Sequence, residues 1–153
     1  MTPLIIFSAQ YMYLVVIVIG ISAVISSTKL IQRNYIKLIF GSFPLAYIMS
    51  KILSVIIIDP RPYLVEHIQP LIHASTDNGF PSDHTLLTMA IASVIFIYHK
   101  KMGIFLGALS VCIGMARVLS YVHHPLDIIG SIVISITSTF IIWYFLNKYR
   151  LLK

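Results

Sequence analysis

Acidic side chains are scarce in this sequence: five Asp and Glu residues occur among 153, and all charged residues together make up 10% of the chain. Hydrophobic residues, by contrast, account for 58%. A soluble domain of this length could not bury so much apolar surface in its core. The composition therefore excludes an ordinary soluble domain and indicates a membrane protein, with room for one domain only (residues 1–153).

Cysteine is almost absent as well, since Cys112 is the only one in the sequence. A single thiol cannot form a disulfide framework within the chain, and it cannot build a metal site made of thiolates. Free cysteine behaves as a small apolar side chain, so we expect Cys112 to be buried among the helices.

Apolar residues are concentrated in five runs. A helix that crosses a bilayer needs about 20 of them. The first run lacks the basic segment and cleavage site of a secretory signal, so we expect a span there. The third is short, and we expect it to begin below the membrane surface, inside protein. We therefore predict an all-α, polytopic transmembrane helix bundle of about five spans. These are Leu4–Ile25, Ile36–Ile58, Thr85–Tyr98, Gly103–Leu119 and Ile128–Leu146.

The distribution of basic residues accounts for the net charge of +6 without a polyanionic partner. Eight of them fall in alternate connections and in the C-terminal tail, which lie on one side of the membrane in a chain of five spans. Basic residues concentrate on the cytoplasmic side. We therefore expect the N-terminus outside, the C-terminus inside, and no nucleic-acid partner. The eight residues are Lys29, Arg33, Lys37, Lys100, Lys101, Lys148, Arg150 and Lys153.

The sequence GFPSDH at residues 79–84 precedes the third apolar run and has the features of an anion-binding helix start. Ser82 suits the N-cap position, and Asp83 suits the first turn, beside the positive end of the helix dipole. The unpaired N–H groups of that turn can bind a phosphate, and His84 can donate or accept a proton there.

Two arginines and a histidine–carboxylate pair are expected on the same, outer face of the bundle. Arg61 follows the second run, Arg117 ends the fourth, and His123 and Asp127 precede the fifth. A spacing of four brings Asp127 within reach of one imidazole nitrogen of His123, which fixes the tautomer and raises the basicity of the other nitrogen. Guanidinium groups bind phosphate oxygens, while one histidine can attack phosphorus and another can protonate the leaving oxygen. The two arginines and the histidines together therefore indicate phosphoryl transfer without a metal.

The other ionisable residues carry weaker signals. Lys51 lies near the middle of the second predicted span, where a charge is costly and is a functional candidate, although it can also snorkel or pair within the bundle. His124 has no partner at helical spacing and suits a cap or interfacial position. Four loop residues match no spacing typical of metal ligands, so we expect them to contact water or headgroups. They are Glu66, His67, His73 and Asp77.

Three motifs together resemble those of a known family. They are Arg61-Pro62, the sequence PSDH at residues 81–84, and Arg117 followed by His123 and Asp127. This pattern resembles the signature of the type 2 phosphatidic acid phosphatase superfamily, which comprises membrane lipid phosphatases and vanadium haloperoxidases. The resemblance implies a site that needs no metal and no other cofactor.

The resemblance also implies a role for each matching residue. His123 would be the nucleophile and form a phosphohistidine, with Asp127 orienting it. His84 would be the general acid and then the base for water. The phosphate would be held by two side-chain guanidiniums, one hydroxyl and the amides of one turn. These groups belong to Arg61, Arg117, Ser82 and the turn that runs from Ser82 through Asp83 to His84.

Three positions depart from the family pattern. Ser54 stands where the family has a lysine, and Lys51 lies about 4.5 Å further along a helix, which argues against its binding phosphate. Ala116 replaces the serine that usually precedes the arginine of the third motif. Asp83 stands where glycine is commonest, so we expect its carboxylate to point away from the phosphate.

The sequences DPRPY (59–63), LIHA (71–74) and DNGFPSDHT (77–85) are similar to bacterial undecaprenyl diphosphate phosphatases of this family. We therefore predict an inner-membrane lipid phosphatase with its site facing the periplasm or the outside, acting on undecaprenyl diphosphate within the bilayer. Lipid A 1-phosphate and phosphatidylglycerol phosphate are alternative substrates, because relatives of the same build act on them. A lipid-binding or transport subunit with a disabled site is the non-enzymatic alternative, and a haloperoxidase is a third. The oligomeric state stays open.

Overall fold

The computed structural model describes residues 2–152, and Met1 and Lys153 lie outside this range. The described residues form seven helices and no strand beyond an isolated antiparallel bridge between Pro60 and Asn78. The helices are α1 (Thr2–Gln10), α2 (Met12–Ile25), α3 (Lys29–Ile56), α4 (Pro62–Val65), α5 (Asp83–Tyr98), α6 (Lys100–Leu119) and α7 (Pro125–Lys148). The predicted all-α class is confirmed.

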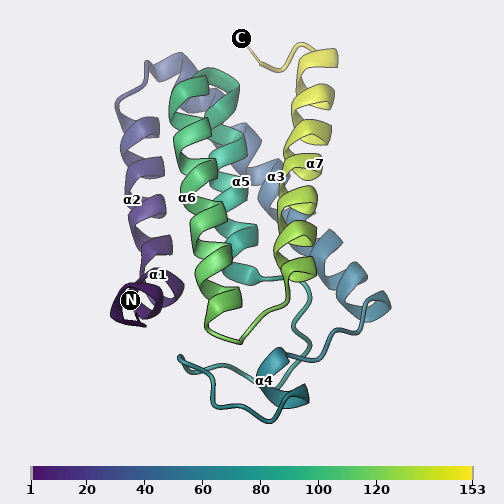
Figure 1. Cartoon of the computed structure of the whole chain (residues 1–153). Helices are drawn as coiled ribbons and strands as arrows, with labels where there is room; N and C mark the ends of the chain where they lie inside the picture. Colours follow the sequence, from purple (N-terminus) through teal and green to yellow (C-terminus); the bar gives the residue numbers. More distant parts are fainter. Residues whose placement is uncertain (1, 153) are drawn as a thin grey trace.

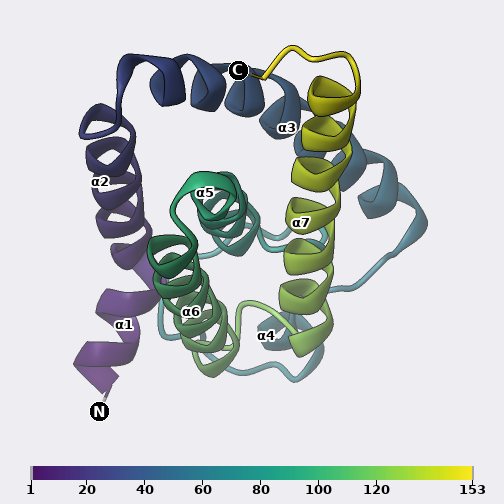
Figure 2. The ribbon, with the colours of Figure 1, turned by 90° about the horizontal axis from the view of Figure 1, so that it is seen from above.

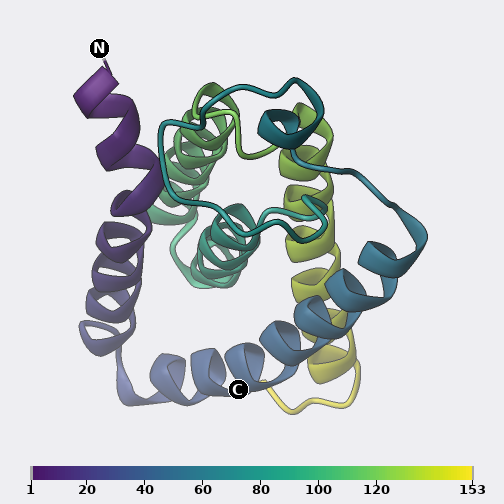
Figure 3. The same cartoon turned by 90° about the horizontal axis from the view of Figure 1, so that it is seen from below.

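Helix α5 is the centre of the bundle. It packs against α2, α3, α6 and α7, and the view along the bundle shows it surrounded by them (Figure 2). Helix α3 crosses the outside of the bundle from α2 to α7, which it also contacts (Figure 3). Long connections and the short α4 cover one end of the bundle, where α5 and α7 begin (Figure 1). This end contains the candidate site.

Two of the predicted spans differ in detail from the helices. The run Leu4–Ile25 is broken at Tyr11 into α1 and α2, which are bent by 49° relative to each other. Helix α3 begins at Lys29, well before the predicted Ile36, because the Thr28 hydroxyl caps it by accepting a hydrogen bond from the N–H of Ile31 (3.5 Å). Arg33 therefore lies within this helix rather than in a connection.

When spans are counted by helix length and hydropathy, fewer are found than the sequence predicts. Helices α3, α6 and α7 are long and apolar enough to cross a bilayer, and the bent pair α1 and α2 makes a fourth if it counts as one span. Helix α5 has 16 residues and falls below that length. By these criteria alone, the prediction of about five spans is not confirmed.

Small hydroxyl side chains line the contacts between α5 and its neighbours, while large apolar side chains face outward. Thr88 of α5 and Ser110 of α6 are hydrogen-bonded at 2.7 Å, and Ser135 of α7 donates to the Leu86 carbonyl at 2.7 Å. Such small polar contacts are typical of helices that pack within a bilayer. Cys112 is exposed on α6, so the expectation that it is buried is wrong. A cysteine is apolar enough to face lipid, which explains its position.

The basic residues that predict the orientation in the membrane gather at the end of the bundle opposite the candidate site. The α2–α3 connection, the α5–α6 connection and the C-terminal end of α7 all lie at this end (Figure 1). Lys37 donates to the Leu151 carbonyl at 2.7 Å, which ties the C-terminal segment to α3. Lys153, the last of the eight predicted basic residues, lies outside the described residues.

Candidate active site

His123 and Asp127 form a buried pair at the start of α7. His124 is the N-cap residue and Pro125 the first residue of this helix, which places Asp127 in its first turn. Oδ2 of Asp127 lies 3.1 Å from Nδ1 of His123 and accepts a hydrogen bond from the N–H of His124 at 2.9 Å. The exposed fraction is 2% for His123 and 0% for Asp127. The contact predicted from their spacing is therefore present.

Two guanidinium groups face the other imidazole nitrogen of His123. Nη1 of Arg61 lies 3.4 Å from Nε2, and Nη2 of Arg117 lies 3.2 Å from it. A guanidinium can only donate hydrogen bonds, so Nε2 must be the acceptor and Nδ1 must hold the proton that is given to Asp127. The site therefore selects the neutral tautomer with a free electron pair on Nε2, directed between two positive charges.

Arg61 is held by Asp77, so the expectation that this loop acid contacts only water or headgroups is wrong. Its Nη2 and Nε donate to Oδ1 of Asp77 at 2.8 and 3.3 Å, and its Nη1 donates to the Val122 carbonyl at 3.0 Å. Hydrogen bonds from the Ser75 hydroxyl and from Arg61 hold the pKa of Asp77 below its ordinary value. No spacing rule could have paired residues 16 positions apart in an irregular loop.

Arg117 reaches the site from the last turn of α6. Its exposed fraction is 8%, and its Nη1 donates to the Ala9 carbonyl of α1 at 3.3 Å. Its Nε is buried and has no hydrogen-bond partner among residues 2–152. An oxyanion near His123 would give this N–H the acceptor that the protein does not supply.

The N-terminus of α5 forms another wall of the site. Ser82 is the N-cap residue and is fully buried, but its hydroxyl caps no backbone N–H of the helix. This hydroxyl accepts a hydrogen bond from Thr85 at 3.2 Å, while the Ser82 carbonyl accepts one from Ser131 of α7 at 2.9 Å. The peptide bond between Phe80 and Pro81 is cis. The hydrogen bond from Ser131 holds the start of α5 beside α7.

His84 lies half-buried in the first turn of α5. Its ring packs edge to face on Tyr13 of α2, with ring centroids 4.8 Å apart. It is close enough to Arg117 and His123 to interact electrostatically with both. The sequence motif therefore brings a second histidine to the same place as the first, from a different helix.

Asp83 of α5 and Lys51 of α3 lie on facing sides of the space between these two helices. Asp83 is exposed, and both residues line a hollow of about 200 Å³ that also borders Arg61 and Asp77. The ammonium group of Lys51 lies 5.3 Å from the centre of the Tyr47 ring, which fits a cation–π contact. Asp83 therefore borders both this hollow and, through its charge, Arg117, while Lys51 contacts Tyr47.

The remaining loop residues of interest lie at the surface. Glu66, His67 and His73 are exposed, so none of them belongs to the buried cluster around His123. Their roles were left open by the sequence, and their positions suit contact with water or lipid headgroups.

Three potential metal ligands come together at one place among residues 2–152, and they are Asp59, His124 and Asp127. Oδ1 of Asp59 lies 2.9 Å from Nδ1 of His124. This is an ion-pair distance, although Nδ1 of His124 has no partner of hydrogen-bonding geometry among residues 2–152. It is shorter than the separation of about 3.3 Å that two ligands of one tetrahedral zinc ion would have. We therefore interpret the group as a cluster of charged side chains and not as a metal centre.

Burial and charge act together on His123. Removal from water lowers the pKa of its imidazole, and the neighbouring positive charges of Arg117 and Arg61 lower it further. Asp127 acts in the opposite direction, through its hydrogen bond and its charge, but does not reverse the effect. The imidazole is therefore held neutral at pH values where a free histidine would be partly protonated.

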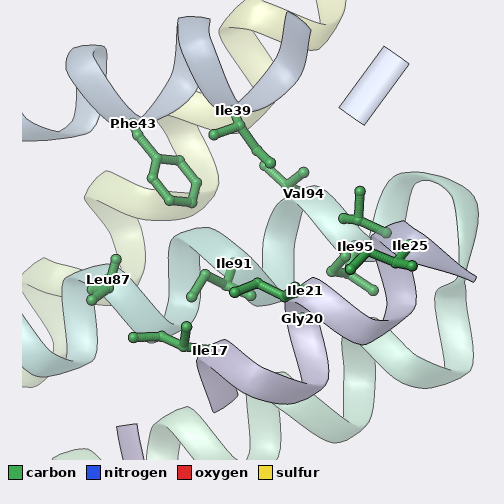
Figure 4. Close-up of a pocket in the computed structure, with 11 residues that line it drawn as sticks. Ile17, Gly20, Ile21, Ile25, Ile39, Phe43, Leu87, Ile91, Val94 and Ile95 are labelled. Atoms are coloured by element: carbon green, nitrogen blue, oxygen red, sulfur yellow. The ribbon is translucent and has the colours of Figure 1, made fainter. Parts of the chain in front are cut away.

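An apolar groove runs along α5 away from this site. One cavity of about 320 Å³ begins at Asp83 and is walled by Phe43 and Tyr47 of α3 and Leu87 of α5. A second, of about 330 Å³, shares Phe43 and Leu87 with the first and continues between α2, α3 and α5 (Figure 4). Every side chain that lines the second cavity is apolar.

Comparison with known proteins identifies the family. The sequence profile of the PAP2 superfamily matches residues 10–151, which is nearly the whole chain. The protein belongs to the PAP2 superfamily. The motif residues of this PAP2 protein are those that the fold brings together around His123, although they come from three separate parts of the chain. Its apolar helices and its bacterial relatives identify a bacterial membrane protein.

Two curated relatives from Bacillus differ in how they are named. The protein is 31% identical over 147 residues to the bacitracin transport permease protein BcrC of Bacillus licheniformis, with 94% of this chain and 71% of that protein covered. It is 28% identical over 103 residues to the undecaprenyl-diphosphatase BcrC of Bacillus subtilis, with 67% of this chain covered but only 53% of that protein.

Two solved structures have the same fold. The crystal structure of LpxE from Aquifex aeolicus matches with a TM-score of 0.65 and 22% identity, over 94% of this chain and 92% of that one. The PAP2-type phosphatidylglycerolphosphate phosphatase from Bacillus subtilis matches with a TM-score of 0.59 and 20% identity, over 96% of this chain and 83% of that one.

Proposed function

We propose that this PAP2 protein is a metal-independent lipid phosphatase that removes the terminal phosphate of a membrane lipid, with undecaprenyl diphosphate as the preferred substrate. The observation that carries the proposal is the environment of His123. Its Nδ1 is paired with Asp127, and its Nε2 is directed between Arg61 and Arg117. A nucleophile aimed at a site of two positive charges suits attack on a phosphate.

In the first step, Nε2 of His123 attacks phosphorus and the bond from phosphorus to the lipid oxygen breaks. His84 gives its proton to that leaving oxygen. Asp127 stabilises the positive charge that develops on the imidazole. The products of this step are a phosphohistidine and the dephosphorylated lipid.

In the second step, His84 takes a proton from water, which attacks the phosphohistidine. The bond from phosphorus to Nε2 breaks, inorganic phosphate is released, and His123 regains its free electron pair. His84 ends the cycle protonated, ready for the next leaving group.

The phosphate itself is held by the guanidinium groups and by donors at the start of α5. Arg61 and Arg117 neutralise its charge, and the buried Nε of Arg117 donates to one of its oxygens. The hydroxyl of Ser82 and the amides of the first turn of α5, at Asp83 and His84, supply further donors. We propose that Asp83 contributes its N–H alone, because a carboxylate directed at the phosphate would repel it.

The apolar groove along α5 supports a lipid as the substrate. It begins at Asp83, next to His84, and leads to a cavity lined entirely by apolar side chains (Figure 4). We assign it to the hydrocarbon chain of the substrate whose phosphate meets His123. The relative named as an undecaprenyl-diphosphatase favours a prenyl chain over an acyl chain.

We further propose five membrane spans, with α1 and α2 together as the first, followed by α3, α5, α6 and α7. Helix α5 is short, but the other helices surround it, so its ends need not reach the lipid–water boundary. Because the basic residues are at the opposite end, the site would face the periplasm or the outside of an inner-membrane protein.

Two alternative substrates and one alternative function have support in the comparisons. The structural neighbours are an LpxE and a phosphatidylglycerolphosphate phosphatase, which fit lipid A 1-phosphate and phosphatidylglycerol phosphate as substrates. The relative named as a transport permease fits a transport subunit. A transport subunit would not need a buried imidazole of fixed tautomer beside two guanidiniums, so we favour an enzyme.

Phosphate release from the purified protein in detergent, with a chelator present, tests this proposal. We expect release from undecaprenyl diphosphate at a higher kcat/KM than from lipid A 1-phosphate or phosphatidylglycerol phosphate. Arg61→Met should abolish release, while Lys51→Met, a matched removal of charge outside the phosphate site, should retain most of it. Absence of release from all three lipids would support the transport subunit, and a preference for another lipid would reassign the substrate.

A further inference from the structure

One oxygen of the catalytic carboxylate is buried without a partner. Oδ2 of Asp127 serves both His123 and the N–H of His124, whereas Oδ1 is inaccessible to solvent and accepts no hydrogen bond among residues 2–152. A buried carboxylate oxygen normally has a donor. The carboxyl group of Asp59 is a close neighbour of Asp127, with one oxygen of each acid within 4.8 Å of the other.

The segment around Asp59 is held firmly in this position. Its N–H donates to the Asn78 side chain at 2.8 Å, and its carbonyl accepts from the N–H of Gly79 at 2.8 Å. Asn78 also donates to the carbonyls of Ser54 and Ile57, both at 2.8 Å, at the end of α3. A Cβ atom at Gly79 would lie 2.9 Å from the Asp59 carbonyl and 3.2 Å from Oδ2 of Asp127, so only glycine fits easily between the two acids.

His124 completes the cluster from the solvent side, and its Nδ1 is a second buried atom without a hydrogen-bond partner among residues 2–152. Oδ1 of Asp59 lies 2.9 Å from its Nδ1, and the side chains are 20% and 36% exposed, respectively. Among residues 2–152, the charged groups that act on Asp59 are Asp127 and His124. Burial in the first place, and the negative charge of Asp127 in the second, raise the pKa of Asp59, whereas His124 acts in the opposite direction without reversing the effect. Two carboxylates side by side are stable only with a positive charge or a proton between them.

We propose that Asp59 and His124 are positioning residues of the catalytic site, in which a protonated Asp59 donates to Oδ1 of Asp127 and accepts from Nδ1 of His124. The chain of hydrogen bonds then runs from His124 through Asp59 and Asp127 to His123. It gives the orphaned oxygen its donor and holds the carboxylate in the orientation that His123 requires. This inference rests on the proposed phosphatase function.

Two substitutions of Asp59 distinguish support of Asp127 by a hydrogen bond from a role in packing alone. Asp59→Asn keeps a donor for Asp127 and an acceptor for His124, so we expect kcat within about threefold of the parent, with KM unchanged. Asp59→Ala removes both, and loss of such a supporting hydrogen bond lowers kcat by about 10-fold to 100-fold. Because the amide cannot lose a proton, Asp59→Asn should also retain activity at pH values above the pKa of Asp59, where the parent declines. His73→Ala, in the exposed loop, is the control.

Three results would overturn the inference. Asp59→Asn and Asp59→Ala could lose the same amount of activity, or Asp59→Ala could lose none. The pH profile of Asp59→Asn could also be identical to that of the parent. Infrared difference spectroscopy supplies a readout that does not depend on turnover: we expect a protonated carboxyl band at neutral pH that is absent in Asp59→Asn. Binding of Zn²⁺ that Asp59→Asn abolishes would instead place a cation in the cluster. Failure of the proposed function itself would appear separately, as a parent protein that releases no phosphate.

Discussion

His123 and His84 occupy different environments, and this difference predicts different consequences when each is replaced. His123 is buried, paired with Asp127 and flanked by two guanidiniums, so no other group can take over its attack on phosphorus. His84 is half-buried against Tyr13, and its contribution depends on how strongly the leaving oxygen needs a proton. General acid catalysis contributes about 10²-fold to 10⁴-fold, and less for a good leaving group.

We therefore expect His123→Ala to abolish turnover of every substrate. His84→Ala should keep an appreciable fraction of activity on a prenyl diphosphate or an aryl phosphate, because the anion that leaves is stable, and almost none on a lipid monophosphate. Rates of both variants on one substrate of each kind provide the measurement. An equal loss for His84→Ala across leaving groups would mean that His84 binds phosphate instead of donating a proton.

The protonation of His123 can be measured directly. Protonated imidazole cannot attack phosphorus, and burial together with Arg117 and Arg61 lowers the pKa of this group. The neutral, active form should therefore persist as the pH falls below about 6.5, the ordinary value for histidine. An NMR titration of ring-labelled histidine, assigned with His123→Asn, measures this pKa without interference from the ionisation of the substrate. A value at or above that of free histidine would contradict the assigned electrostatics.

The sequence predicted the contact between His123 and Asp127, because residues four apart at a helix start lie close together. It also predicted that Arg61, Arg117 and Ser82 share one face of the bundle, because the alternation of spans places their connections on the same side. It did not predict Asp77 as a partner of Arg61, or Asp59 as a neighbour of Asp127. Both acids lie in irregular segments whose course depends on the hydrogen bonds of Asn78 and Gly79. No periodicity encodes such contacts.

At the scale of elements, the position of α5 depends on its close contact with α6. A Cβ atom at Gly103 would lie 2.4 Å from the Cα of Phe96, a backbone atom of α5, whereas a Cβ atom at Gly107 would meet nothing within 4 Å. Both glycines are on α6, four residues apart. They are therefore a matched pair for testing how tightly α5 is held.

We expect Gly103→Ala to lower the free energy of unfolding by about 1–3 kcal/mol, since overpacking of this kind forces the two backbones apart. Gly107→Ala should leave it nearly unchanged. Thermal unfolding of the two variants in the same detergent provides the comparison. Similar stability of the two proteins would show that α5 and α6 can separate without cost.

The apolar runs of the sequence correctly located the helices other than the short α4, because hydrophobicity dominates the pattern of a membrane protein. Their ends were predicted less well. The break at Tyr11 carries no proline or glycine signal, and the early start of α3 depends on the Thr28 cap, which a search for apolar runs overlooks.

At the scale of the whole molecule, the distribution of charge predicts the orientation in the membrane. In a variant that lacks Cys112, a cysteine introduced at Asn78 should react with an impermeant thiol reagent added to intact cells. A cysteine at Lys101, at the opposite end of the bundle, should react only after permeabilisation. The reverse pattern would put the site in the cytoplasm and would overturn the proposed topology.

The central claim is that His123 carries the phosphate during turnover, and trapping of that intermediate tests it most directly. The purified protein would be mixed with undecaprenyl diphosphate labelled in its terminal phosphate and quenched in alkali, in which phosphohistidine survives. We predict label on the protein at the peptide that contains His123, in the presence of chelator, with none in His123→Ala. Phosphate release without labelled protein, or label that persists in His123→Ala, would contradict the account.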